Sequence, residues 1–352
     1  MLGNKVIIVG GYPPPFGGIT VHVQRLANVL NQHYDVKIVD FYGKPAVSDQ
    51  SGSGAKVYRL RRGSVRTILS VLKDLFVGRG IVHLHVSSVS NVLRLLFFVA
   101  TKSTKTLLLT IHGGSFADRI SKKGLLSRSL LRWTLACFDR IILVNSEQQK
   151  ALKTLHIPES KIAIIPAYIK AEAVPSIDII SKMAEIRLRN DLILISSGFG
   201  LSYYGYHDIL QALSVTYRDK KVALILALYN SYDERYLSNL HTLSVTLEHV
   251  EYLILQDTHP DEFNYVLGQC DTYIRATTRD GDSVAVREAL QLGLNVICSD
   301  CVERPNGTVL FHCNSAESLS AALCRASRSQ VPRALSQHDN AKEILEVYEC
   351  LR

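Results

Sequence analysis

The feature that most constrains the fold of this chain is a regular alternation of short apolar runs with longer segments of helical periodicity. A first series of strand-like runs covers residues 5–9, 36–39, 81–84, 106–111 and 140–144. A second series covers residues 192–196, 222–226, 252–254, 272–274, 295–297 and 308–311. Helical patterns lie between them, at residues 20–32, 125–137, 206–217, 260–268, 284–292 and 316–327. This order is typical of parallel sheets joined by crossover helices.

Two such series predict an α/β protein with two Rossmann-like, doubly wound domains, and a chain of 352 residues is long enough for two cores. We expect an N-terminal domain over residues 1–170, a C-terminal domain over residues 188–335, and a linker near residues 165–186. Residues 336–352 should contain an amphipathic helix that crosses back to the N-terminal domain or packs on the other. Ligands of open parallel sheets bind beyond the carboxyl ends of the strands, so the domains would face a central cleft.

Composition limits the types of binding partner and the cellular compartment to be expected. A formal net charge of +8 indicates an anionic partner, but no zinc-finger or RNA-binding signature accompanies it, so nucleic acid is not expected. Seven cysteines without a secretory leader favour reduced thiols in the cytoplasm, and the Cys298–Cys301 pair is interpreted as structural. The most apolar stretch, residues 92–111, contains Arg94, Lys102 and Lys105, so it is not a membrane span.

Two loops of the first domain carry residues suited to a ligand. Gly17 and Gly18 would let backbone amides approach a phosphate at a helix N-terminus, although a plain strand-to-helix turn explains them equally. His112 follows the strand at 106–111, where a ligand would lie, and a structural histidine is the alternative. His83 and His85 allow the same two interpretations on weaker grounds, and no third ligand is apparent that would complete a metal site.

The strongest signal lies at residues 275–300, where a strand, a polar glycine turn, a helix and another strand follow in order. Asp280 and Glu288 are eight residues apart, and carboxylates at these positions can bind the vicinal hydroxyls of a sugar or ribose. Backbone amides near Ser283 can bind a phosphate at the helix N-terminus. A solvated acidic turn before a well-capped helix is the alternative.

Together these motifs resemble family 4 of the GT-B glycosyltransferases, over nearly the whole chain. Asp280-Gly281 followed by Glu288-Ala289 matches the E-x7-E element of that family, with Asp in place of the first Glu. The other matching motifs, in the family's order, are Gly17-Gly18, His112-Gly113-Gly114, Ser146-Glu147 and Ile165-Pro166. The His-Gly-Gly-Ser form and the Gly281-Asp282-Ser283 turn are most similar to members that build bacterial surface polysaccharides.

The resemblance implies a retaining, metal-independent glycosyltransferase whose nucleotide-sugar is a substrate and which has no cofactor. The acceptor would be a glycan, possibly linked to a lipid diphosphate, in the synthesis of O-antigen, capsule or exopolysaccharide. The catalytic residues it implies are His112 beside the transferring sugar, Asp280 on the sugar hydroxyls and Glu288 on the ribose. The donor-binding residues it implies are Gly17, Gly18, Gly198, Arg275, Arg279, Gly281, Asp282, Ser283 and Val284.

One departure from the family concerns the charge near the leaving group. The family carries Arg and Lys after the first strand of the second domain, where this chain has Phe199 and Tyr204. Those cations stabilise the leaving diphosphate, and such charge stabilisation is often the largest catalytic contribution. Arg275 and Arg279 are our hypothetical substitutes.

Basic residues of the first domain suggest contact with the cytoplasmic face of a membrane. The two clusters are Arg59, Arg61, Arg62 and Arg66, and Lys122, Lys123, Arg128 and Arg132. The second alternates with leucines and Trp133, a pattern that favours binding to an anionic membrane surface, with an ordinary surface helix as the alternative.

Three other functions remain open on the sequence alone. Phe199 and Tyr204 would also fit a non-catalytic GT-B-like binding subunit. A nucleotide-sugar epimerase of GT-B fold would act without an acceptor. Asp280-Gly281-Asp282 could be the metal-binding D-x-D of a GT-A transferase, but the order of the motifs and the two predicted sheets argue against it.

Overall fold

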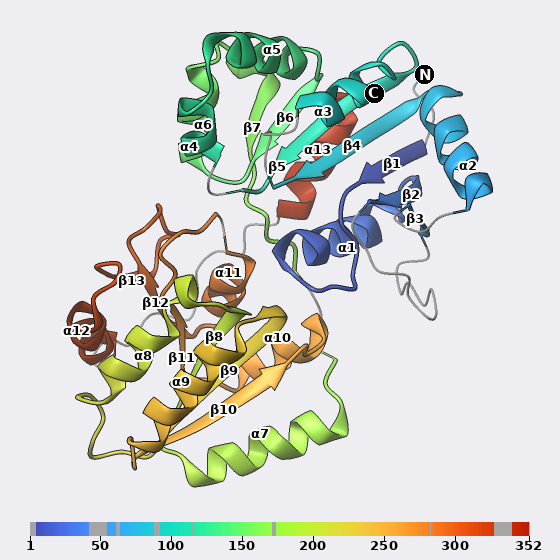
Figure 1. Cartoon of the computed structure of the whole chain (residues 1–352). Coiled ribbons are helices and arrows are strands. Elements are labelled where there is room, and N and C mark those ends of the chain that lie inside the picture. Colours follow the sequence, from blue (N-terminus) through green and yellow to red (C-terminus); the bar gives the residue numbers. More distant parts are fainter. Residues whose placement is uncertain are drawn as a thin grey trace. The chain divides into compact units, whose positions relative to one another are not determined.

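The structure is a computed structural model (Figure 1) that describes residues 5–41, 55–60, 64–87, 92–113, 116–170, 174–281, 283–326 and 340–351. The chain divides into two compact units. Unit 1 comprises Met1–Lys170 and Asp339–Arg352, and unit 2 comprises Ala171–His338. Each unit is a parallel sheet covered by helices on both faces, so the prediction of two doubly wound α/β units is confirmed.

The sheet of unit 1, within the described residues, has seven parallel strands in the order β3-β2-β1-β4-β5-β6-β7. Their bounds are β1 Lys5–Val9, β2 Asp35–Asp40, β3 Lys56–Arg59, β4 Gly80–Val86, β5 Lys105–Ile111, β6 Arg140–Leu143 and β7 Ile162–Ile164. Successive side chains of a strand point to opposite faces, so both faces need apolar residues. In β1, Ile7 and Val9 enter one core and Val6 and Ile8 the other.

The helices of unit 1 divide between these two faces. One face packs against α1 (Gly18–Leu30) and α13 (Asn340–Cys350), which buries Ile344, Val347 and Tyr348. The other face packs against α2 (Val65–Phe76), α3 (Val92–Val99), α4 (Phe116–Ser121), α5 (Leu125–Ala136) and α6 (Ser146–Lys153). The final helix of the chain, drawn red in Figure 1, therefore completes the core of the N-terminal sheet.

The sheet of unit 2 has six strands in the order β10-β9-β8-β11-β12-β13 within the described part of the chain. Their bounds are β8 Leu192–Gly200, β9 Val222–Tyr232, β10 Val250–Gln256, β11 Thr272–Arg275, β12 Asn295–Ser299 and β13 Thr308–Phe311. One face packs against α8 (Tyr206–Leu213), α9 (Glu234–Val245) and α12 (Ala316–Ala326). The other packs against α7 (Ile177–Arg189), α10 (Pro260–Gly268) and α11 (Val284–Gln291).

The second half of the segment expected to be a linker is the start of a helix of unit 2. Within residues 165–186, α7 begins at Ile177, where the Ser176 side chain accepts a hydrogen bond from the Ile179 amide. Met183 and Ile186 are buried in the core of unit 2. Many side chains of α7 are exposed and polar, and two prolines precede the helix. These features together suggested a linker.

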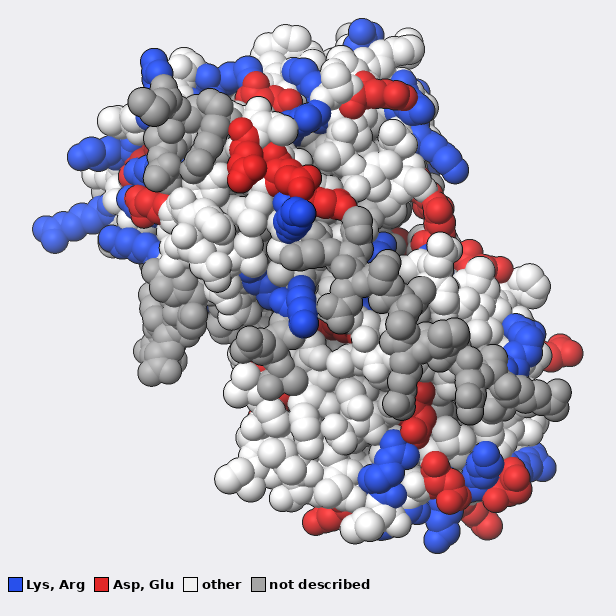
Figure 2. All heavy atoms as spheres, turned by 180° about the vertical axis from the view of Figure 1, so that it is seen from behind, with Lys and Arg blue, Asp and Glu red and all other residues white. Residues whose placement is uncertain are grey.

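The apolar stretch at residues 92–111 forms α3 and then the buried strand β5. Among the described helices, none combines the length and the apolar character needed to cross a bilayer. On the face drawn in Figure 2, Lys and Arg side chains occur in small groups, with Asp and Glu among them and uncharged areas between. The described Lys and Arg side chains therefore do not form one continuous basic area on that face.

Strand order reverses once in each sheet. The reversal lies between β1 and β4 in unit 1 and between β8 and β11 in unit 2. The loops that leave adjacent strands at such a point diverge to opposite faces of the sheet, which opens a crevice at the carboxyl ends of the strands. The residues that follow β1, β4, β8 and β11 are therefore the first candidates for ligand contact.

Candidate active site

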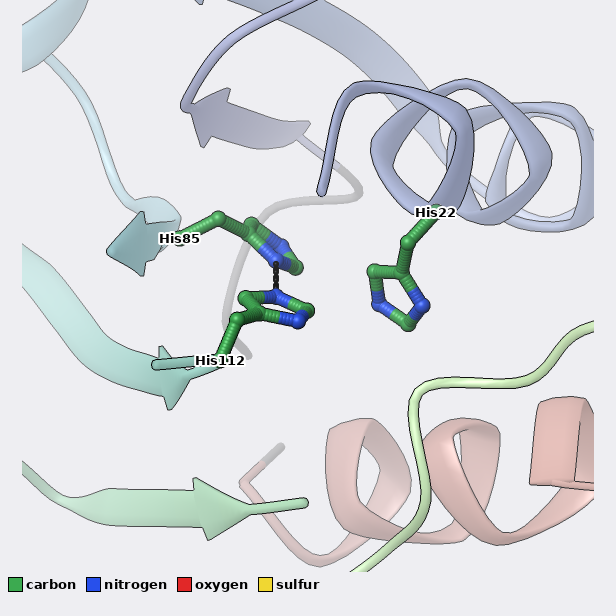
Figure 3. A group of neighbouring side chains, drawn as sticks. All are labelled: His22, His85 and His112. Carbon is green, nitrogen blue, oxygen red and sulfur yellow. Dashed lines mark hydrogen bonds between the residues drawn. The ribbon is translucent and has the colours of Figure 1, made fainter. Parts of the chain in front are cut away.

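Three histidines from three elements meet at the carboxyl end of the unit 1 sheet (Figure 3). His85 lies near the end of β4, His112 directly follows β5, and His22 lies on α1. His85 Nδ1 and His112 Nε2 are 3.0 Å apart, and the ring centroids of His22 and His112 are 4.9 Å apart. Sequence reasoning singled out His112, left His85 open and missed His22, because no local pattern relates a helical residue to strands that pair with it only in the fold.

Hydrogen bonds fix the ring orientation of His22 and of a fourth histidine, His83, that neighbours the group. His22 Nδ1 lies 2.6 Å from the carbonyl oxygen of Ala167, to which it donates. The ring of His83 packs beside that of His85, with their centroids 4.1 Å apart. Its two nitrogens lie 2.7 Å from the hydroxyls of Tyr348 and Thr110.

Burial keeps these imidazoles neutral at physiological pH. Burial lowers the pKa of His22 to about 4, against the raising effect of its hydrogen bond to Ala167. Burial, together with the neighbouring histidines, also holds the pKa values of His83, His85 and His112 well below their ordinary range. A neutral imidazole has one N–H donor and one lone pair, so His112 can donate to or accept from a ligand.

The glycine pair begins α1 in the same unit. Gly17 is the N-cap in an extended conformation, and no side chain of the described residues caps the helix. A Cβ added at Gly18 would meet no described atom within 4 Å, and one at Gly17 only Thr20 Oγ1 at 3.9 Å. Packing within the described part of the unit therefore does not require glycine at these positions, and the first amides of α1 remain available to an anion.

Arg59 lies under the loop that precedes these glycines. Its guanidinium pairs with Asp40 at 2.9 Å and donates to the carbonyl of Pro13 at 2.7 Å. This corrects the assignment of Arg59 to a membrane-facing basic cluster, because the side chain is only 12% exposed and is used inside the unit. Arg61 and Arg62 lie outside the described residues.

In unit 2, Asp280 is the centre of a buried ionic network. The Arg275 guanidinium donates to both of its carboxylate oxygens, at 2.9 and 3.0 Å. Arg304 Nη1 donates to Oδ2 at 2.8 Å, and the Gly281 amide donates to Oδ1 at 3.0 Å. Burial alone raises the pKa of Asp280, but the charges and hydrogen bonds of the two arginines outweigh it and hold that pKa well below its usual range.

The partners of Asp280 bear on its predicted role as a sugar-binding residue. Asp280 was expected to contact sugar hydroxyls, yet its oxygens already accept four close hydrogen bonds from the protein. Arg304 was missed, although it follows β12, the strand beside β11. A basic residue after the neighbouring strand is a signal that could have identified it, because parallel strands end at the same edge of a sheet.

The start of α11 contains the remaining residues of the E-x7-E element. Ser283 is the N-cap and is buried, Val284 is the first residue of the helix, and the Glu288 side chain is buried one turn later. The helix start has no side-chain cap among the described residues. Asp282 lies outside the described residues.

An aromatic cluster occupies the positions where the resembled family has its two cations. The Tyr204 ring lies directly against Gly198, where a Cβ would overlap the ring. Phe199 and Tyr203 contact the Tyr204 ring, with centroids 5.6 and 4.7 Å away. Gly198 therefore makes room for an aromatic side chain of its own unit.

Two arginines face this aromatic cluster. The Arg275 guanidinium lies 5.0 Å from the Tyr204 ring centroid and also donates to the Ser197 carbonyl at 2.8 Å. The exposed Arg279 lies 4.4 Å from the centroid of Tyr203. Arg275 is thus used within unit 2, while Arg279 keeps a guanidinium at the surface.

Among the residues that the structure describes, His22, His85 and His112 form the one group of three or more potential metal ligands. Asp280 is a poor ligand for a divalent cation, because two arginines already hold its oxygens. The first carboxylate of the D-x-D alternative is therefore engaged elsewhere.

Residues 16–172 match the model of Glycosyltransferase Family 4. No curated protein sequence matches the chain.

Several solved structures share the fold of both units. HepE of Anabaena, in complex with UDP and glucose, is 13% identical with a TM-score of 0.68, and the match covers 98% of this chain and 99% of that one. A glycosyltransferase from Rickettsia africae is 15% identical with a TM-score of 0.69, over 99% and 98% of the two chains. Sucrose-phosphate synthase of Thermosynechococcus elongatus is 16% identical with a TM-score of 0.68, over 99% and 96%. These matches confirm the GT-B architecture and exclude the GT-A alternative.

Proposed function

We propose, for a chain that carries a glycosyltransferase family 4 domain on a GT-B fold, that it transfers a sugar with retention from a nucleotide-sugar to a glycan acceptor. The observation that carries this proposal is the position of the candidate ligand-binding residues in each sheet. In unit 1 they follow β1 and β5 or end β4, and in unit 2 they follow β11 and β12, so in each unit they lie at or next to the reversal of strand order. That is where doubly wound sheets bind their ligands.

We assign binding of the nucleotide-sugar donor to unit 2. The start of α11 would receive the diphosphate, and Glu288 the ribose hydroxyls. The two arginines around Asp280 leave that network with a net positive charge, which favours an anionic ligand nearby. UDP-sugars are the first donors to test, since the structures of HepE contain UDP, UDP with glucose, and UDP-glucose.

In unit 1, His112 would lie beside the transferring sugar, and the backbone amides of Gly17 and Gly18 would approach the diphosphate. In the proposed step the bond between the sugar anomeric carbon and the diphosphate oxygen breaks, and the acceptor oxygen bonds to that carbon on the same face. The diphosphate oxygen takes the proton of the acceptor hydroxyl. The chemical step needs neither a protein base nor a metal ion.

The experiment is a donor screen followed by turnover. Thermal-shift and saturation-transfer NMR measurements with UDP-, GDP- and ADP-sugars should identify one nucleotide that binds. Turnover with an acceptor extract should then yield a product with the anomeric configuration of the donor. Inversion would refute retention, and sugar isomerisation without acceptor would favour the epimerase.

We place the acceptor on a lipid diphosphate of bacterial polysaccharide synthesis and the protein at the cytoplasmic face of the membrane. The support lies at the start of α5, where Leu125 and Leu126 are 83% and 89% exposed. Trp133 is also exposed, and Lys122 and Lys123 precede the helix. Exposed apolar side chains beside basic ones favour an anionic bilayer surface.

Liposome binding tests this location. The chain should bind vesicles with anionic lipid, and salt should weaken the binding. Replacing Leu125 and Leu126 with Glu should weaken binding by about a hundredfold. Leu188→Glu is the matched control, because Leu188 is 87% exposed on α7 of the other unit. Equal loss in both variants, or no binding at low salt, would contradict the proposal.

The second candidate function is a non-catalytic subunit that binds a nucleotide. It is favoured by the aromatic cluster at the positions where family members have Arg and Lys. Nucleotide-sugar binding without turnover, for every donor and acceptor tested, would support it.

A further inference from the structure

We propose that His22, His85 and His112 form a binding site for one divalent transition-metal ion, with zinc as the best match. Each residue offers one ring nitrogen, and these three nitrogens all lie within 4.8 Å of one another. Figure 3 shows the three rings converging from α1, β4 and the end of β5. This inference concerns unit 1 alone and does not depend on the proposed transferase activity.

The ligand type and spacing suit zinc. Zinc binds neutral imidazole at about 2.0–2.1 Å in a tetrahedral arrangement, which places ligand nitrogens about 3.3 Å apart. His85 Nδ1 and His112 Nε2 are already 3.0 Å apart. Between two neutral imidazoles at this distance one proton is shared. A metal ion can take its place once that proton moves to the other nitrogen of the same ring.

His22 is already oriented as a ligand. Its Nδ1–H donates to the Ala167 carbonyl at 2.6 Å, which leaves the lone pair on Nε2. This Nε2 is buried and has no hydrogen-bond partner among the described residues. Figure 3 shows it on the side of the ring that faces His85 and His112. A backbone carbonyl on the far nitrogen is the usual outer contact of a metal-bound histidine, because it fixes the tautomer and the ring orientation.

The neighbouring histidine is excluded as a ligand. Both nitrogens of His83 are engaged, with the hydroxyls of Tyr348 and Thr110 at 2.7 Å. Its ring packs against His85 at an interplanar angle of 41° and limits the movement of that ligand. The site therefore has three protein ligands, and water or an anionic oxygen would complete the tetrahedron. Bound metal would occupy a nitrogen of His112, so we expect zinc to inhibit any reaction that uses this side chain.

The first test measures zinc binding by the full chain after chelator treatment, using elemental analysis and competition with a metal-indicator dye. We expect one tightly bound ion per chain. His22→Asn, His85→Asn and His112→Asn should each weaken binding by about a hundredfold or more. The control is His207→Ala, since His207 lies half exposed in unit 2, and it should leave binding unchanged. Unchanged binding in any of the three cluster variants would overturn the three-histidine site.

Three measurements on the unaltered protein guard against variants that fail to fold and against binding by thiols. Zinc X-ray absorption should show imidazole nitrogen as the protein donor, and cobalt should give no thiolate charge-transfer band. Zinc should also raise the melting temperature, since it binds the folded state. Thiolate ligation, or no binding at all, would refute the site. Either result would leave the transferase proposal untouched.

Discussion

Arg304 and Asp280 are 24 positions apart in the sequence, yet Arg304 Nη1 donates to Asp280 Oδ2 at 2.8 Å. The two side chains are 2% and 9% exposed, so the pair is removed from water. Since Arg275 binds the same carboxylate, the loop after β11 is tied both to its own strand and to the loop after β12. This contact shapes the candidate donor site.

Arg304→Ala should therefore destabilise the protein by about 3 kcal/mol, because it takes one cation from a buried carboxylate and opens space beside Ser299. Denaturant unfolding would measure the change. The control is Arg189→Ala, whose pair with Glu251 lies at the surface and should cost much less than the buried pair. Equal costs would show that the buried network contributes no more than a surface pair.

Stability should also depend on the ionisation of Asp280 in acid. Its pKa is held well below the ordinary range by the arginines, despite burial. Above about pH 4 the carboxyl is ionised in both states, and its contribution to stability is fully present. As the pH falls further, the unfolded chain takes up the proton first, so the folded state loses that contribution. The stability difference between wild type and Asp280→Asn should thus be constant at neutral pH and shrink below about pH 4.

Gly205→Ala should destabilise unit 2 for two separable reasons. Gly205 has a φ of +70°, and a Cβ there would overlap the backbone carbonyl of Ala276. Gly78 has a φ of +73° but no described atom within 4 Å of its would-be Cβ. Gly78→Ala should cost about 1 kcal/mol from the backbone conformation alone. Gly205→Ala should cost about 1–3 kcal/mol more from the overlap, and a calorimetric comparison in which the two variants match would contradict this.

Arg279→Ala should reduce turnover by about a hundredfold and leave the melting temperature unchanged, if this side chain neutralises the leaving diphosphate. The reason is its position at the surface over Tyr203, where it contributes little to folding. Arg275→Ala should lower both turnover and stability, because Arg275 also holds Asp280 and the Ser197 carbonyl. Unchanged rates in both variants would remove the hypothesis that these arginines replace the family's cations.

Thiol labelling should separate the cysteines by burial. Cys324 and Cys350 are exposed and should react first with a maleimide at pH 8, whereas Cys270 and Cys298 are buried and should stay protected. Burial raises the pKa of the Cys298 thiol to about 12, so raising the pH to 9 should not expose a thiolate there. Mass spectrometry of labelled peptides would measure this, with labelling in denaturant as the control for all sites. Early modification of Cys298 would contradict its interpretation as a structural thiol.

Much of the fold was accessible from local sequence patterns. The runs at residues 5–9, 260–268 and 308–311 coincide with β1, α10 and β13. Strand β1 is continuously apolar because it is buried on both faces, and α10 repeats its apolar residues with the helical period. The short strands β3 and β7 and the helix α2 were missed. Strand β3 begins and ends with a basic residue, β7 is only three residues long, and α2 leaves Val65, Ile68 and Leu69 exposed.

The sequence by itself determined two doubly wound units, the order of the motifs and the placement of His112, Asp280 and Glu288 after or beside strand ends. Only the tertiary structure decided which partners these residues meet. It brought His22 to His85 and His112, Arg304 to Asp280, and the final helix with Tyr348 to the N-terminal sheet. Strand and helix periodicity is a local property of the backbone, whereas these contacts depend on strand order and register, which no short segment encodes.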